Sequence, residues 1–220
     1  MKLTFERKTA DKQNAPAQFY EKVEHYDELI MVYRSAIREI TTKLEILNDE
    51  LSMSGHNNPI EFIKSRVKSP QSIVNKLEAL GCDVNEDSII ANLNDVAGVR
   101  VVCPFINDVY TVAEMLTSQD DITVIEKKDY IRSPKANGYR SYHLILEVPV
   151  FLSNSKLIVR TEVQIRTVAM DFWASLEHQM RYKKELQNSG EISEELRVCA
   201  ENIAATDVKM MAIRDKIKNG

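Results

Sequence analysis

Hydrophobic residues recur at alternating steps of four and three near the start of the chain. They are Phe19, Val23, Tyr26, Ile30, Tyr33, Ile37, Ile40, Leu44, Leu47 and Leu51. This spacing places the apolar side chains along one stripe of a long helix, which we predict at residues 16–54. The run Ser54-Gly55-His56-Asn57-Asn58-Pro59 then ends the helix. The stripe either lies on its own domain or packs against another subunit or the C-terminal helix, and its length favours the second interpretation.

A similar stripe occupies the C-terminal part of the chain. Its members are Ile192, Leu196, Cys199, Ile203, Met210, Ile213 and Ile217, with Thr206 as a polar interruption. We predict a helix at residues 191–218, preceded by the break Ser189-Gly190. The two terminal helices are expected to flank a central unit and to help build an oligomer.

Residues 57–184 contain patterns of both strands and helices. Strands are predicted at 96–103, 121–129, 142–150 and 156–166, and helices at 70–80, 107–118 and 168–184. The alternation is strictest in 156–166, where Val159, Thr161, Val163 and Ile165 face one way and Arg160, Glu162, Gln164 and Arg166 face the other. The chain is therefore predicted to be a single α/β domain over residues 1–220 with a helix at each end.

Composition narrows the possible functions. The chain has 220 residues, of which 44% are hydrophobic, so it can bury a sizeable core. Its net charge of −4 argues against broad binding of polyanions. No apolar segment suits a signal peptide or a membrane span. The three cysteines, Cys82, Cys103 and Cys199, lack zinc-ligand spacing and indicate reduced thiols in a cytoplasmic protein.

The segment 127–143 concentrates five cations and three tyrosines around a Pro-x-x-x-Gly turn. Such a loop can hold a phosphate with its cations and a base or sugar with its rings. There is no P-loop and no GxGxxG motif among the six glycines. Any phosphates must therefore be held by side chains rather than by a glycine-rich backbone cradle.

A second cationic group surrounds the start of the helix predicted at 70–80. Ser69-Pro70 suits the cap and first turn of that helix. Ser72 and Lys76 stand on one of its faces, and Arg66 and Lys68 lie just before it. The helix N-terminus also favours an anion, so the group suits a triphosphate. The alternative is an ordinary solvated amphipathic helix.

Two carboxylates and an arginine accompany the predicted strands. Asp95 stands at the entrance of the strand 96–103, and Arg100 lies inside it. A buried guanidinium needs a partner, or it stacks on a base; strand parity disfavours pairing with Asp95. Glu162 could join Asp95 in holding Mg²⁺, or it could belong to a solvated strand face. His143 is either structural or a contact to a phosphate or hydroxyl group.

Together these motifs resemble the RelA/SpoT-type alarmone synthetases, specifically the single-domain small alarmone synthetases (RelP/RelQ-like). The resemblance covers roughly residues 57–183. It runs through Asn58-Pro59-Ile60-Glu61, Arg66-Val67-Lys68-Ser69, Asp95-Val96-Ala97-Gly98-Val99-Arg100, Lys128-Asp129-Tyr130-Ile131, Pro134-Lys135-Ala136-Asn137-Gly138-Tyr139-Arg140-Ser141-Tyr142-His143, Glu162-Val163-Gln164-Ile165-Arg166-Thr167 and Ala169-Met170-Asp171-Phe172-Trp173. The opening Gly55-His56-Asn57-Asn58-Pro59 and Asp171 look closer to the RelP branch.

The resemblance implies a nucleotidyltransferase-like fold, with a mixed sheet flanked by helices. It implies a cytoplasmic GTP pyrophosphokinase that uses Mg²⁺ to transfer pyrophosphate from ATP to the 3′-hydroxyl of GTP or GDP, releasing AMP and forming (p)ppGpp. A homotetramer is also implied, built through the terminal helices, and an alarmone or RNA regulator is compatible with it. The chain resembles only the synthetase part of the longer family members.

The resemblance also implies residue roles. On the donor side, Arg66 and Arg100 would sandwich adenine, while Lys68, Ser72 and Lys76 would hold the ATP phosphates. Asp95 and Glu162 would bind Mg²⁺, and Glu162 would also take the proton from the 3′-hydroxyl. On the acceptor side, Tyr139 would stack on guanine and Asp171 would accept its N1–H and N2–H₂ groups. Lys128, Lys135 and His143 would meet the acceptor's phosphates, with Asn137 and Gln164 as polar contacts.

Two other classes of function compete with this one. The first is a non-catalytic nucleotide- or RNA-binding regulator on the same scaffold; the acidic net charge argues against it, and pure binding does not need Glu162. The second is a structural helical oligomer, which leaves the loop at 127–143 unexplained.

Overall fold

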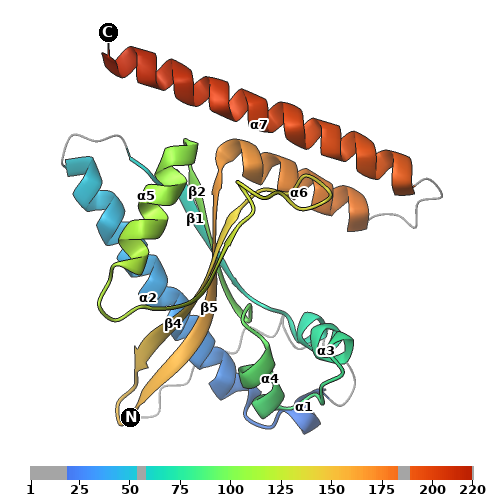
Figure 1. Cartoon of the computed structure of the whole chain (residues 1–220). Coiled ribbons are helices and arrows are strands. Elements are labelled where there is room, and N and C mark those ends of the chain that lie inside the picture. The colour runs from blue at the N-terminus through green and yellow to red at the C-terminus, as the bar shows by residue number, and fades with distance from the viewer. Residues whose placement is uncertain (1–18, 54–57, 183–188, 220) are drawn as a thin grey trace.

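A five-stranded mixed sheet flanked by helices forms the centre of the protein, as the computed structural model shows (Figure 1). The structure describes residues 19–53, 58–182 and 189–219. The elements are α1 (Phe19–Lys22), α2 (Tyr26–Met53), β1 (Phe62–Val67), α3 (Pro70–Ala79), α4 (Glu86–Asn92), β2 (Ala97–Cys103), α5 (Ile106–Thr117), β3 (Thr123–Asp129), β4 (Tyr142–Phe151), β5 (Lys156–Thr167), α6 (Val168–Tyr182) and α7 (Ser189–Asn219). The predicted fold class is confirmed. Over these residues, every helix is too short or too polar to cross a membrane.

Strand β5 lies in the middle of the sheet, whose order is β1-β2-β5-β4-β3. It pairs in parallel with β2 and antiparallel with β4. Its alternation follows the prediction: Val159, Thr161, Val163 and Ile165 are buried. Because period two assigns alternate residues to opposite faces, Glu162 and Gln164 lie on the face turned away from this core.

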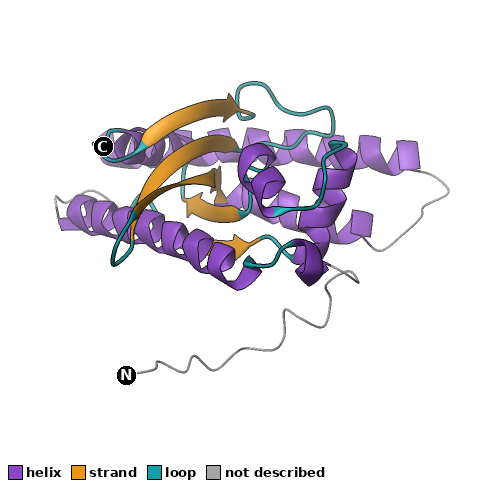
Figure 2. Ribbon diagram, turned by 90° about the horizontal axis from the view of Figure 1, so that it is seen from below, coloured by secondary structure: helices purple, strands orange, loops and turns teal. Residues whose placement is uncertain are grey.

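Helix α2 covers the apolar face of the sheet, and the strands curve over it (Figure 2). Its seam from Tyr26 to Leu44 is buried in the same core as the strands. The interpretation that this seam packs against another subunit or the C-terminal helix is therefore wrong. The sheet has one large apolar face to cover, and α2 covers it together with α5.

The N-terminal helix also differs from the prediction in its continuity. A single helix at 16–54 was predicted, but α1 ends at Lys22 and α2 begins at Tyr26. The intervening Val23 is fully buried, so the chain keeps its apolar contacts through the break. The predicted stop at Ser54-Gly55-His56-Asn57 lies outside the described residues.

Two elements were missed by the sequence patterns. Strand β1 is an edge strand with three exposed residues, so it lacks the alternation that identifies the inner strands. Helix α4 is only seven residues long and has Asn85 as its N-cap. The predicted capping of α3 is confirmed: Ser69 Oγ accepts from the Ser72 backbone N–H at 3.4 Å, and Pro70 opens the helix.

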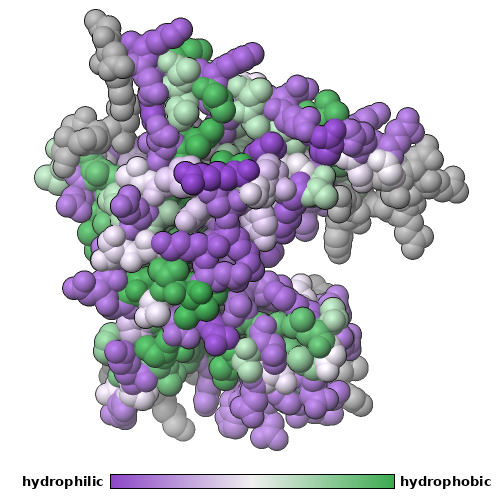
Figure 3. Space-filling view, in the orientation of Figure 1, coloured by the Kyte–Doolittle hydropathy of each residue, from purple (hydrophilic) through white to green (hydrophobic). Residues whose placement is uncertain are grey.

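Helix α7 lies next to α6 across one end of the molecule (Figure 1). Only part of its predicted seam is covered. Ala200 and Asp207 are its buried residues, and Leu196 and Ile203 pack beside Ala200, whereas Met210, Ile213 and Ile217 are exposed. The space-filling view shows hydrophilic residues across the centre of one face, with hydrophobic residues grouped above and below (Figure 3).

The packing of α2 leads to a matched pair of stability predictions. Ile40 is fully buried in the core, whereas Ile46 on the same helix is 60% exposed. Ile40→Ala should destabilise the protein by about 2–5 kcal/mol, because it leaves a cavity against the sheet. Ile46→Ala should change stability by less than about 0.5 kcal/mol. Urea unfolding measures both, and equal losses would contradict the assignment of α2 as the cover of the sheet.

Candidate active site

Strand pairing brings functional side chains into two rows across one face of the sheet. The first row runs through one residue of each strand: Lys64, Arg100, Gln164, His143 and Lys128. The second row lies beside it and runs through Arg66, Gly98, Glu162, Ile145 and Glu126. Directly paired residues share a face, so the register alone gathers side chains that are up to a hundred residues apart.

The donor side of these rows opens into a cavity of about 210 Å³. Arg66, Asp95, Arg100, Glu162 and Gln164 line it together with Lys64, Ser65, Gly98 and Val99. The structure therefore brings the two predicted carboxylates and the two predicted adenine-flanking arginines to one cavity. Gly98 lies between Arg66 and Glu162 in the register, and its missing side chain leaves the cavity open.

Asp95 is held by two lysines at the edge of the cavity. Lys68 Nζ lies 2.8 Å from Oδ2, and Lys76 Nζ lies 2.8 Å from Oδ1. Burial alone would raise the pKa of Asp95, but the hydrogen bonds and charges of Lys68 and Lys76 bring it below its ordinary value. Ser72, four residues before Lys76 on α3, is hydrogen-bonded to Ser69. Two cations share one carboxylate, so the group carries net positive charge suited to a phosphate.

Glu162 is fixed by two neighbouring donors. His143 Nδ1 lies 3.2 Å from Oε1, and Gln164 Nε2 donates to Oε2 at 2.8 Å. Burial opposes ionisation of this carboxyl, but the contacts with His143 and Gln164 outweigh it and bring the pKa of Glu162 below its ordinary value. The carboxylate is therefore ionised near neutral pH and held in one orientation.

Tyr139 meets the same network from the loop between β3 and β4. Its hydroxyl lies 2.9 Å from His143 Nε2 and accepts from Arg166 Nη2 at 2.6 Å. Its ring packs edge-on against Tyr130 and His143, and the cations of Lys135 and Arg166 lie within 5.1 Å of the ring centroid. The Tyr139 hydroxyl group therefore links His143 to Arg166.

Asp171 lies between the two sides of the site. Its Oδ1 is 3.2 Å from Arg100 Nη1 and 3.3 Å from Arg166 Nη1. Arg166 is almost fully buried and also donates to Gln164 Oε1 at 2.8 Å. Arg100 thus pairs with Asp171 and not with Asp95, in agreement with the strand parity that disfavoured a pair between Asp95 and Arg100. Burial, followed by the charge of Arg166, lowers the pKa of Arg100.

The remaining predicted acceptor residues lie around the loop. Lys135 Nζ lies 4.7 Å from the centroid of the Tyr130 ring, and Lys128 pairs with Glu126 at 2.9 Å. Asn137 Nδ2 donates to Glu177 Oε1 on α6 at 3.1 Å. None of these three lines the cavity that holds Asp95 and Glu162. They connect to it through Tyr139 and His143.

Two residues of the site received no role from the sequence. Lys64 lines the donor cavity two residues before Arg66, and Arg166 joins Tyr139, Gln164 and Asp171. Arg166 could have been found, because it shares the polar face of β5 with Glu162 and Gln164. Lys64 could not, because β1 was not recognised as a strand.

The carboxylates of the site fit a divalent cation that is bound together with phosphates. Asp95 and Glu162 line one cavity, and the charge of Asp95 opposes ionisation of Glu162, so the carboxylates are close enough to interact. Among the described residues, no group of three His, Cys, Asp or Glu side chains could hold a metal. The other ligands would have to be phosphate oxygens and water, the environment that Mg²⁺ prefers.

Comparisons with known proteins all find similarity to one family. Residues 65–187 match the family described as a region found in RelA/SpoT proteins. The GTP pyrophosphokinase YwaC of Bacillus subtilis is 43% identical over 195 residues, covering 89% of this chain and 93% of that protein. The crystal structure of small alarmone synthetase 2 from B. subtilis is 46% identical, with a TM-score of 0.76, and covers 84% of this chain and 97% of that one.

A second B. subtilis structure is similar over most of its length. It is small alarmone synthetase 1 bound to its product pppGpp, which is 33% identical with a TM-score of 0.80. The match covers 88% of this chain and 98% of that one.

The lysine pair around Asp95 predicts a dependence of stability on pH. Asp95→Asn should destabilise the protein by about 1–3 kcal/mol near pH 7, since two lysines then face each other without a counter-charge. The folded pKa of Asp95 lies below its unfolded value, so its contribution is fully present above about pH 4. The difference between wild type and variant should stay constant from pH 7 to 5 and shrink as the pH falls below about 4. Urea unfolding at several pH values measures it; a difference that grows with acid would contradict this.

Proposed function

The chain belongs to the RelA/SpoT family, among its small alarmone synthetases, and we propose that the two rows across its sheet bind ATP and a guanine nucleotide side by side. The chain is a GTP pyrophosphokinase, which makes (p)ppGpp from these substrates. The observation that carries the proposal is the register of β5. In this register Gln164 pairs with Arg100 on the donor side and with His143 on the acceptor side, and Glu162 stands two residues before it on the same face.

The donor side suits ATP. Arg66 and Arg100 come from neighbouring strands and line one cavity, where two planar guanidinium groups can flank an adenine ring. Lys68 precedes α3, Ser72 stands in its first turn and Lys76 in its last, and these residues bind the phosphates of ATP. When phosphates take these lysines, Asp95 is released from its ion pairs. Lys64 is a further cation at this cavity.

The acceptor side suits GTP or GDP. Tyr139 offers its ring to guanine, and Lys128, Lys135 and His143 supply cations or donors for the phosphates. Asn137 orders the loop through Glu177 and the Tyr139 backbone N–H. Asp171 recognises the guanine edge only if it exchanges one of its two arginine partners for the base.

The reaction joins the acceptor's 3′-oxygen to the β-phosphorus of ATP. The bond between the β-phosphorus and the oxygen bridging it to the α-phosphorus breaks, and AMP leaves with that oxygen. Glu162 takes the proton of the 3′-hydroxyl. Because the pKa of Glu162 is low, it is a weak base, and most of its effect is to position the hydroxyl group.

Asp95 and Glu162, which line one cavity, would hold Mg²⁺. The metal held there would supply positive charge that stabilises the charge developing on the transferred phosphates. Gln164 and His143 keep the Glu162 carboxylate turned into the cavity.

We also propose that the protein is a cytoplasmic homotetramer. Val168, Phe172, Leu176 and Met180 recur every fourth residue of α6 and are all more than a third exposed. Together with the exposed Met210, Ile213 and Ile217 of α7, they supply apolar surface for contacts between subunits.

The proposed location and the proposed assembly rest on different observations. The free thiols Cys82, Cys103 and Cys199 suit a reducing compartment such as the cytoplasm. Light scattering that finds only 25 kDa particles at micromolar concentration would refute the tetramer.

The reaction class is tested by incubating the protein with ATP, Mg²⁺ and either GTP or GDP. AMP and a guanine product carrying two additional phosphates should form in equal amounts. Chromatography that resolves both products also reveals which acceptor is preferred. Binding of both nucleotides without AMP would favour a non-catalytic regulator instead.

Glu162→Gln separates catalysis from binding. The variant should keep affinity for both nucleotides within about threefold, because the amide still fills the space. AMP release should fall by at least about a hundredfold, because the proton acceptor and a metal ligand are lost. Glu147→Gln is the matched control: Glu147 lies on β4 and pairs with Arg160 at 3.6 Å. Equal AMP release from the wild type and Glu162→Gln would defeat the assignment.

Removal of divalent metal tests the second carboxylate. EDTA in excess should abolish AMP release, and added Mg²⁺ should restore it, because Asp95 and Glu162 need a cation between them and the phosphates. Asp95→Asn should require a Mg²⁺ concentration at least about tenfold higher for half-maximal rate. An unchanged Mg²⁺ requirement in that variant would contradict the role of Asp95.

A further inference from the structure

The loop that carries Tyr139 is pressed against helix α7. We call residues 130–141, between β3 and β4, the acceptor loop. At Gly138 the backbone has φ of 85°, a conformation that side-chain-bearing residues rarely adopt. A Cβ atom at this position would lie 2.6 Å from the Cβ of Ala200 and 3.4 Å from the carbonyl oxygen of Arg197. The loop backbone therefore touches α7 where neither side has room for a larger residue.

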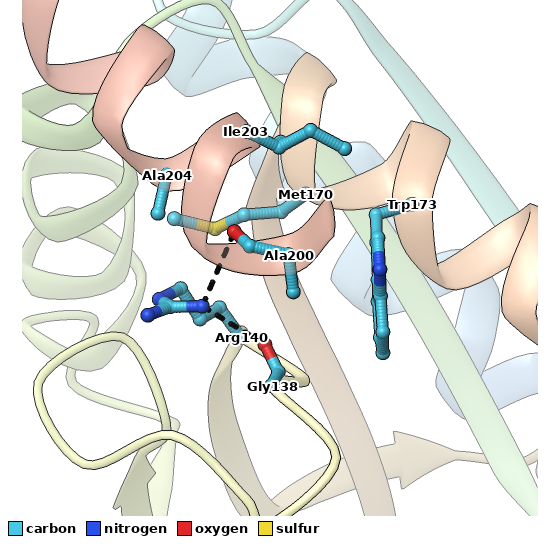
Figure 4. Close-up of a pocket in the computed structure, with 7 residues that line it drawn as sticks. All are labelled: Gly138, Arg140, Met170, Trp173, Ala200, Ile203 and Ala204. Atoms are coloured by element: carbon cyan, nitrogen blue, oxygen red, sulfur yellow. Dashed lines mark hydrogen bonds between the residues drawn. The ribbon is translucent and has the colours of Figure 1, made fainter. Parts of the chain in front are cut away.

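Arg140 joins the loop to α7 by hydrogen bonds (Figure 4). Its Nη1 donates to the Gly138 carbonyl oxygen at 3.0 Å and to the Ala200 carbonyl oxygen at 3.4 Å. The same site is lined by Met170 and Trp173 of α6 and by Ile203 and Ala204 of α7. One guanidinium group thus contacts both the turn of the loop and the backbone of the helix.

Helix α6 contacts α7 close to Ala200. Trp173 Nε1 donates to the Leu196 carbonyl oxygen at 2.9 Å, about one turn before Ala200. Trp173, Ala174 and Ala200 form a small apolar cluster that is separate from the main core. Tyr139 packs against this cluster. The ring proposed to receive guanine therefore rests partly on α7.

The residues on either side of Tyr139 set its position. Gly138 and Arg140 contact α7, while the Tyr139 hydroxyl reaches His143 and Arg166 in the opposite part of the site. A shift of α7 relative to the sheet would move the backbone of Gly138 and with it the Tyr139 ring. Helix α7 packs mainly on α6 and α5, whereas Arg66 stands on β1 and Asp95 is held by Lys68 and Lys76, so the donor cavity would keep its shape.

We propose that Ala200 and Arg140 are positioning residues for the acceptor nucleotide, and that α7 is the surface that sets the acceptor loop. This inference rests on the proposed function, because it assigns guanine to the Tyr139 side. It places the control of acceptor binding on a helix that lies outside both nucleotide sites. Its consequence is selective: changes at the contact alter the use of GTP or GDP and leave the use of ATP unchanged.

Ala200→Val tests the proposal, with Ala205→Val as the matched control. Ala200 is 4% exposed and meets Gly138, whereas Ala205 is exposed on the same helix. Inserting two methyl groups into this contact costs about 1–3 kcal/mol, which corresponds to a factor of about 5–150. The KM for GTP should therefore rise at least about fivefold, while the KM for ATP stays within about twofold. Ala205→Val should change neither value.

A second variant tests the same contact in case Ala200→Val does not fold. Arg140→Met keeps a long side chain but cannot donate to either carbonyl oxygen, and it should give the same selective rise in the KM for GTP. Circular dichroism establishes that each variant is folded. Equal increases in both KM values, or unchanged KM values in both variants, would overturn the inference.

The proposed enzymatic function and the proposed role of α7 would fail in different ways. If the wild type releases no AMP, the proposed function fails; GTP binding by calorimetry then decides the inference, since Ala200→Val should still weaken GTP and spare ATP. If the wild type is active but neither variant separates the two KM values, only the role of α7 fails.

Discussion

The pairing of β5 with β2 on one side and β4 on the other is the constraint on which the site depends. One face of β5 must bury Val159, Val163 and Ile165 against the core under α2, and this requirement fixes the register. The same register fixes the direction of the side chains on the other face, so Glu162 and Gln164 must point away from the core. A slip of one residue would exchange the apolar set for the charged set, so the stability of the sheet and the geometry of the site have one cause.

The arrangement of charges in the site favours an anionic ligand. Asp95 is shared by Lys68 and Lys76, and Asp171 is shared by Arg100 and Arg166. Each carboxylate thus neutralises only one of two cations. An acidic protein can bind two polyphosphates in this way, because the excess of positive charge is confined to one face of the sheet.

The acceptor side is built differently from the donor side. The donor residues Arg66, Arg100 and Glu162 stand on strands, and Ser72 and Lys76 stand on α3; these elements contribute to the main core. Tyr139 stands on a loop whose support comes from α6 and α7 and from a smaller apolar cluster. A site on strands is rigid because both strand neighbours hold it, whereas a loop takes its position from whatever it packs against. This difference makes the two halves of one reaction separable by substitutions far from the phosphates.

The amino-acid sequence by itself determined the strands β2, β4 and β5, the helices α3, α5 and α6, and the kinds of residue in the site. Those features depend on local periodicity, on the capping of α3 by Ser69 and on motif order, all of which are visible along the chain. It did not reveal β1, whose exposed edge lacks alternation, or the partner of the α2 seam, since a stripe of apolar residues does not specify what covers it. Only the tertiary structure decided that Asp95 pairs with lysines, that Asp171 joins two arginines and that Gly138 meets Ala200. Contacts between distant segments follow from strand register and helix packing, which no local pattern contains.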